Sequence, residues 1–170
     1  MKKLVLAILF IAFIFPVNAQ TKKELKKEKA EKEYTKTKTL IDSGIFIFNA
    51  DWATTQKGNR ISLIGNPNFL KIDKENAIAD LPYFGVSQSP SVGMTDGGGI
   101  AFEGLINDYV VEYNDKKQKV IIKFSTNNKT ENFNVTLAVY KSGNANLDII
   151  SNSRNSISYD GKVSKIKNDK

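Results

Sequence analysis

The spacing of hydrophobic residues changes from a helical period to a strand period near Gly44. After this glycine, apolar residues recur at every second position in short segments, which predicts strands with one buried and one solvated face. In the segment 132–140, four apolar residues are predicted to face the core: Phe133, Val135, Leu137 and Val139. The segment 45–53 is similar, with Phe46, Phe48, Ala50 and Trp52 predicted on one face and Ile45 and Ile47 on the other.

About nine or ten such strands are predicted, joined by short polar turns, and no helix-length apolar pattern lies among them. Strands with one buried face and one solvent-exposed face are typical of antiparallel sheets. We therefore predict a single all-β domain over residues 44–163, folded as an antiparallel barrel or a closely related sandwich. Periodicity alone does not separate these two architectures.

The first 19 residues have the pattern of a secretory signal peptide. A basic start, MKK, precedes twelve apolar residues, LVLAILFIAFIF, which are too few for a comfortable membrane span. Small residues at Val17 and Ala19 then predict cleavage between Ala19 and Gln20. The alternative is an uncleaved N-terminal anchor. The expected product is an exported protein, periplasmic or secreted, and soluble after cleavage.

Residues 20–43 are rich in lysine, glutamate and other helix formers, with opposite charges at helical spacing. Their apolar positions are sparse, so the stripe is expected to be too thin to dock firmly. A solvated linker, helical or disordered, is the first interpretation, and a basic arm touching an anionic envelope surface is the alternative. Residues 164–170 are predicted to be a disordered basic tail.

The net charge of +7 lies in the ends of the chain. Residues 44–161 carry nine Lys and two Arg against eight Asp and four Glu, one net negative charge. A globular part without surplus positive charge argues against a phosphate-tracking groove, so we expect no nucleic-acid partner.

The chain contains no His and no Cys. Ser-His-Asp and Cys-His catalytic sites, ordinary zinc sites and disulfides are therefore impossible. The carboxylates lie mostly in turn-like contexts, and no calcium or phosphate-binding loop is complete. We expect a protein without enzymatic activity, metal or cofactor.

The segment LPYFG, Leu81–Gly85, raises the question of a binding site. Pro82 lacks a donor N–H and should end the preceding strand, which leaves Tyr83 and Phe84 at the lip of the sheet. Gly97, Gly98 and Gly99 begin the next strand after a long loop, 86–96, that could form a flap. In one interpretation an aromatic ring covers bare glycine backbone. In the other, Tyr83 and Phe84 line the mouth of a barrel.

Three blocks of the sequence, LPYFG, DGGGIAFEG and LDIISNSRNSISYDGKV, resemble the family called domain of unknown function 4251, small secreted proteins of Gram-negative envelopes. The resemblance covers about residues 45–163 and excludes the Lys-rich segment. It implies a lipocalin-like barrel and carries no catalytic residue. The matching positions are Leu81, Pro82, Tyr83, Phe84, Gly85, Gly98, Gly99, Phe102, Ser156, Tyr159 and Gly161.

Two functions follow as hypotheses. A barrel of about eight strands can enclose one small apolar ligand. The aromatic candidates for its cavity are Phe46, Trp52, Tyr83, Phe84, Phe102 and Tyr159, while Leu81, Pro82, Gly85, Gly98, Gly99 and Gly161 are expected to shape the backbone. The alternative is a solidly packed barrel that binds another envelope protein or the envelope surface. The oligomeric state is left open.

Overall fold

The computed structural model describes residues 21–65, 68–86, 98–129 and 131–166. The predicted signal peptide, the loop 87–97 with Gly97, and the last four residues of the predicted tail lie outside these ranges. One helix, α2 (Lys22–Asp42), precedes the strands. A short 3-10 helix, η1 (Asp115–Lys117), connects β6 to β7. The strands are β1 (Ile45–Thr55), β2 (Arg60–Ser62), β3 (Phe69–Asp73), β4 (Asn76–Leu81), β5 (Ile100–Leu105), β6 (Asn107–Asn114), β7 (Lys119–Asn127), β8 (Asn132–Tyr140), β9 (Asn144–Ser151) and β10 (Ile157–Ser164).

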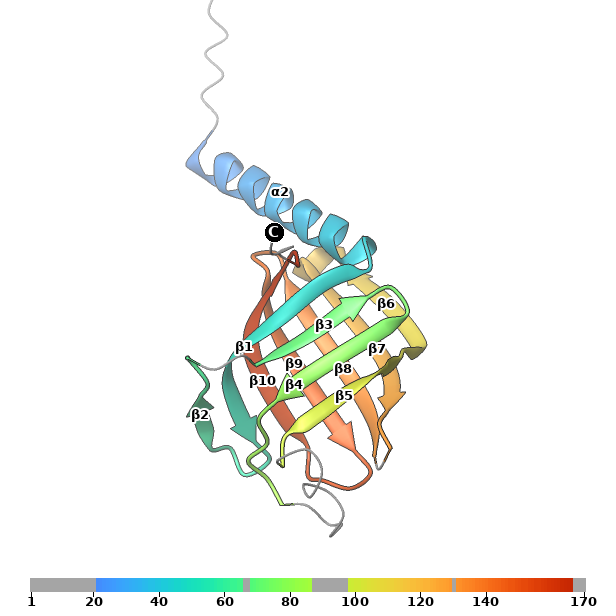
Figure 1. Ribbon diagram of the computed structural model, residues 1–170. Coiled ribbons are helices and arrows are strands. Elements are labelled where there is room, and N and C mark those ends of the chain that lie inside the picture. The colour runs from blue at the N-terminus through green and yellow to red at the C-terminus, as the bar shows by residue number, and fades with distance from the viewer. Residues whose placement is uncertain (1–20, 66–67, 87–97, 130, 167–170) are drawn as a thin grey trace, which may run out of the picture.

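All ten strands belong to one antiparallel sheet, which curls into a nearly closed barrel (Figure 1). Its order is β5-β4-β3-β1-β10-β9-β8-β7-β6, and the short β2 pairs with β1. The seam lies between β5 and β7, where Thr126 donates a hydrogen bond to the Leu105 carbonyl (3.0 Å) and Asn128 donates one to Ala101 (3.0 Å). The predicted antiparallel barrel is confirmed, and the single sheet decides against a two-sheet sandwich.

The interior of the barrel is lined by the apolar residues that alternate along the strands. The four residues of β8 predicted to face the core are at most 1% exposed, while Thr136 between them is half-buried, so the predicted inner face is confirmed. Ala138 is also buried, at 7% exposure. Many interior side chains are 0% exposed and are surrounded by other atoms of the barrel: Phe46, Phe48, Leu70, Ile72, Ala77, Val120, Ile122, Leu137, Val139, Leu147 and Tyr159. These side chains fill the interior around them.

Trp52 is not on the inner face, contrary to the sequence prediction. A bulge in β1 between Ala50 and Trp52 breaks its register with β10. One extra residue reverses the inward and outward positions that follow. Ala53 is therefore fully buried, whereas Trp52 lies outside against the guanidinium of Arg60, 4.8 Å from the ring centre.

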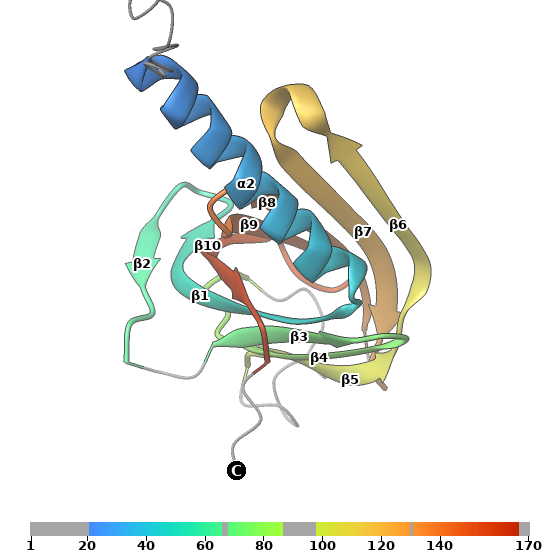
Figure 2. The same ribbon diagram turned by 90° about the horizontal axis from the view of Figure 1, so that it is seen from above.

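The Lys-rich segment is a continuous helix, and its second half docks on one end of the barrel (Figures 1 and 2). Tyr34, Thr37 and Ile41 are buried there, at the i, i+3, i+7 spacing of one helix face. The expectation that the apolar stripe is too thin to dock is therefore wrong for this half, because the few apolar residues concentrate in the last turns. Residues 21–29 are exposed and extend beyond the barrel. Over the described ranges, no helix is long and apolar enough to cross a membrane.

The inward and outward positions of β8 predict how much substitutions on this strand lower the free energy of unfolding. Leu137→Ala is expected to lower the free energy of unfolding by about 2–5 kcal/mol, because it empties part of a packed interior. Val135→Ala is expected to fall in the same range, while Thr136→Ala should cost less than about 1 kcal/mol. Urea unfolding followed by circular dichroism measures all three, and equal costs at 136 and 137 would contradict the register.

Candidate functional site

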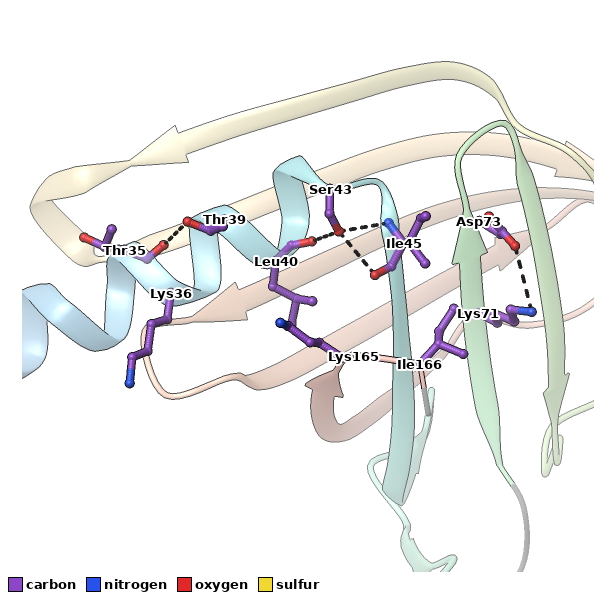
Figure 3. Close-up of a pocket in the computed structure, with 10 residues that line it drawn as sticks. All are labelled: Thr35, Lys36, Thr39, Leu40, Ser43, Ile45, Lys71, Asp73, Lys165 and Ile166. Atoms are coloured by element: carbon purple, nitrogen blue, oxygen red, sulfur yellow. Dashed lines mark hydrogen bonds and ion pairs between the residues drawn. The ribbon is translucent and has the colours of Figure 1, made fainter. Parts of the chain in front are cut away.

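A groove separates the C-terminal half of α2 from the adjoining end of the barrel (Figure 3). It is open to solvent and has a volume of about 910 Å³. This lies within the about 300–1,000 Å³ usual for small-molecule sites. Its lining comes from α2, β1, β3 and the chain after β10: Thr35, Lys36, Thr39, Leu40, Ser43, Ile45, Lys71, Asp73, Lys165 and Ile166.

Three aliphatic side chains give the groove its apolar surface. Leu40 is half-buried and packs against the core, Ile166 is half-buried, and Ile45 is 39% exposed. Ile45 points away from the interior because its neighbour on β1, Phe46, points inward. The groove therefore offers apolar contact area that the barrel itself does not use.

Lysines border this apolar surface. Lys36 lies on α2, Lys71 on β3 and Lys165 just after β10, so lysines from three distant parts of the sequence line the groove. The lining contains a single carboxylate, Asp73, with its Oδ2 4.0 Å from Nζ of Lys71. An apolar floor with a net positive border matches a ligand that combines an apolar chain with an anionic group.

The turn after α2 sets the position of the groove. The hydroxyl of Ser43 donates to the Leu40 carbonyl (2.6 Å) and accepts from the N–H of Ile45 (3.2 Å). Gly44 follows with φ = 64°, a left-handed conformation that favours glycine. The chain thereby turns from helix to strand within two residues, and Leu40 and Ile45 come to line the same groove.

The other side of α2 is fastened to the β6–β7 hairpin. The hydroxyl of Tyr34 donates to Asp115 (3.0 Å), and the Lys38 ammonium contacts Asp115 (3.2 Å) while lying over the rings of Tyr34 and Tyr113. Tyr113 in turn donates to Asp42 at the end of the helix. These contacts hold α2 over the barrel and leave the groove on its opposite side.

The protonation states of the side chains in this contact favour the docked position of α2 at neutral pH. Burial and the hydrogen bond to Asp115 raise the pKa of Tyr34 to about 12, and the hydrogen bond to Asp42 with burial raises the pKa of Tyr113 to about 12. Both phenols therefore stay protonated donors. Hydrogen bonds from Tyr34 and Lys38 lower the pKa of Asp115. The stabilisation that its carboxylate gives to the docked helix is therefore present at neutral pH and is lost only as the pH falls through that lowered pKa.

The aromatic residues predicted to line a cavity do not share one site. Phe102 and Tyr159 belong to the packed interior, where the Phe102 ring lies 5.1 Å from that of Phe133. The Tyr159 hydroxyl donates to the Pro82 carbonyl (2.7 Å), and burial raises the pKa of Tyr159. Phe84 is 42% exposed and follows β4, whose last residue, Leu81, lies at the barrel end away from α2. Trp52 is on the outer wall.

Tyr83 is part of a buried polar cluster that sequence reasoning missed. The guanidinium of Arg154 pairs with both carboxylate oxygens of Glu131, and their side chains are 1% and 0% exposed. Arg154 also donates to the Gly98 carbonyl (2.8 Å) and lies 5.1 Å from the ring centre of Tyr83. The chain has only two arginines among its 25 basic residues, Arg60 and Arg154, and this rarity was the available signal.

The contacts of this cluster account for several residues of the LPYFG segment. Tyr83 donates to the carbonyls of Val86 and Asn155, so its ring is held in place at the barrel end. A Cβ on Gly85 would lie 2.2 Å from the Tyr83 hydroxyl, so a larger residue there would displace the Tyr83 side chain. Gly98 has φ = 86° and Leu81 is fully buried, while Gly99 is half-buried. The ring of Tyr83 thus covers Gly85 and Arg154, and the segment anchors the barrel end.

Among the residues that the structure describes, no group of three or more Asp or Glu side chains is placed to hold a metal ion. Glu131, the fully buried carboxylate, is neutralised by Arg154 and also accepts from the hydroxyl of Ser151 (2.6 Å). The groove beneath α2 is therefore the candidate binding site.

Comparisons with known proteins agree on the fold. The family model for the domain of unknown function DUF4251 matches residues 28–163, which includes more than half of α2 in addition to the barrel. A crystal structure of a DUF4251 family protein from Bacteroides eggerthii DSM 20697 is similar with a TM-score of 0.62 and 16% identity, over 78% of this chain and 87% of that chain. No curated protein shows significant sequence similarity to the chain. The predicted resemblance is confirmed, and the chain belongs to the DUF4251 family.

Proposed function

We propose that this protein is a non-enzymatic binding module that holds the apolar chain of a small amphiphile in the groove beneath α2. The observation that carries the proposal is the groove itself, with Leu40, Ile45 and Ile166 as its apolar surface and lysines at its border. The barrel interior supports it less well as a site, because the side chains without accessible surface already fill the space around them. Export to the periplasm or beyond, as the signal peptide predicts, would bring such a module into contact with envelope lipids.

The proposal is tested by titrating the ¹⁵N-labelled protein with laurate, below its micelle concentration, and following amide chemical shifts. We expect the shifts to centre on Leu40, Ile45 and Ile166. Ile45→Glu should weaken binding by about 10- to 100-fold, since it places a charge on the apolar surface. Ile150→Glu is the matched control, because Ile150 is also an exposed strand isoleucine (56%) and does not line the groove. Equal binding by both variants would refute the groove as the site.

A second candidate is a protein-interaction module with a packed barrel. Its specific support is β6, an edge strand that is exposed over almost its whole length. Val110 and Tyr113 on this strand are 47% and 43% exposed. Native mass spectrometry of protein purified without denaturant distinguishes the candidates, because a small bound mass supports the groove and a bound protein supports β6.

A further inference from the structure

Three lysines of α2 follow one another along the helix face that leads to the groove. Residues at i, i+4, i+7 and i+11 share one face. Counted back from Lys36, which lines the groove, this face carries Lys32, Lys29 and Leu25. Three of the four glutamates of α2, at 24, 28 and 31, lie towards the side of Asp42 and the β6–β7 hairpin, while Glu33 flanks the other edge of this face. A basic stripe, defined here as Lys29, Lys32 and Lys36, therefore leads along the helix into the groove.

The lysines of the stripe form no close ion pair within the described part of the chain. Among the residues with described positions, no carboxylate lies within 4 Å of the amines of Lys29, Lys32 or Lys36, whereas Lys27 pairs with Glu31 at 3.8 Å. At 1.5 Å per residue, Lys29 and Lys36 are about 10 Å apart along the helix axis. Lys165, on the other wall of the groove, is likewise without such a partner. The stripe and Lys165 thus present several free cations next to the apolar surface.

We infer that the natural ligand of the groove is a single-chain lipid whose head group is a phosphate or another multiply charged anion, with the acyl chain on Leu40, Ile45 and Ile166 and the head group on the basic stripe. The inference rests on the proposed function and adds the chemical class of the head group. A carboxylate would satisfy one lysine, whereas a phosphate oxyanion accepts charge-assisted hydrogen bonds from several. Leu25 continues the stripe as an exposed apolar residue (51%), so a longer molecule would keep both kinds of contact along α2.

The test compares two lipids that differ only in the phosphate, 1-lauroylglycerol and 1-lauroylglycerol 3-phosphate, by calorimetric titration below their micelle concentrations. We expect the phosphate form to bind the wild-type protein about tenfold more tightly, with an advantage that shrinks as salt is raised. Lys32→Gln with Lys36→Gln should abolish most of this advantage and leave the affinity for 1-lauroylglycerol unchanged. Lys23→Gln with Lys27→Gln removes two charges from the opposite face and should leave both affinities unchanged.

The outcomes separate the two proposals. If both lipids bind equally, or if the two double variants lose the phosphate advantage equally, the head-group inference is overturned while the groove function stands. If neither lipid binds, the groove function fails and the inference fails with it. If sn-glycerol 3-phosphate without an acyl chain binds as tightly as the lipid, the site recognises a free phosphate and the single-chain lipid is refuted.

Discussion

Replacing Arg154 by methionine is expected to lower the free energy of unfolding by about 3–5 kcal/mol, the largest effect of any single charge in the described structure. The substitution keeps much of the side-chain volume but leaves the carboxylate of Glu131 fully buried without its partner. It also removes the donor to the Gly98 carbonyl and the cation beside Tyr83. Chemical unfolding followed by far-UV circular dichroism measures the loss.

The second arginine is the control. Arg60 pairs with Asp160 at 3.2 Å, but their side chains are 56% and 44% exposed. Water screens this pair, so Arg60→Met is expected to cost less than about 1 kcal/mol. Replacing Arg154 and Glu131 together by methionine should cost less than the sum of the two single changes, because no unpaired charge stays buried. Similar losses for Arg60→Met and Arg154→Met would show that the buried pair has no special weight.

Gly161→Ala is expected to destabilise the barrel by about 3 kcal/mol or more, since the added methyl group has no space. Its Cβ would lie 2.0 Å from the carbonyl oxygen of Asn49 and 2.9 Å from Cα of Ala50. Both atoms belong to the backbone of β1, beside the bulge, so relief requires the paired strands to separate. Urea unfolding reports the loss, and the midpoint should fall without a change in slope.

Gly58→Ala provides the comparison for Gly161→Ala. Gly58 has φ = 84° and nothing within 4 Å of the position that a Cβ would take. Gly58→Ala should lower the free energy of unfolding by about 1 kcal/mol, because alanine is disfavoured at this positive φ. If Gly161→Ala were no more costly than this, close approach of the strands would not explain the glycine.

The two ends of the barrel differ in the side chains that they present. The end away from α2 is closed by buried polar contacts, in which Tyr83, Glu131 and Arg154 satisfy one another and nearby carbonyls. The end beneath α2 leaves apolar side chains partly exposed beside lysines. The LPYFG segment, which first suggested a ligand site, contributes Tyr83 to the contacts at the end away from α2. The candidate groove is instead bordered by a helix that was first interpreted as a linker.

Much of the barrel could be predicted from the sequence, because each strand records its buried face in its own alternation. For β8 the four residues predicted to face the core are buried. The prediction failed at Trp52, since a bulge is a property of two paired strands and leaves no mark in the alternation of one. It also missed Glu131 and Arg154, since a buried ion pair looks like two polar surface positions until the chain brings them together.

The sequence by itself determined the class of fold, the family and the chemistry that is impossible without His or Cys. These follow from local periodicity and from composition, which need no knowledge of distant neighbours. Only the tertiary structure decided that α2 docks, because three buried residues in its last turns matter more than the low average hydrophobicity of the helix. Only the structure brought Leu40, Ile45, Lys71 and Ile166 together, because they come from four segments that meet when the sheet closes and the helix crosses its end.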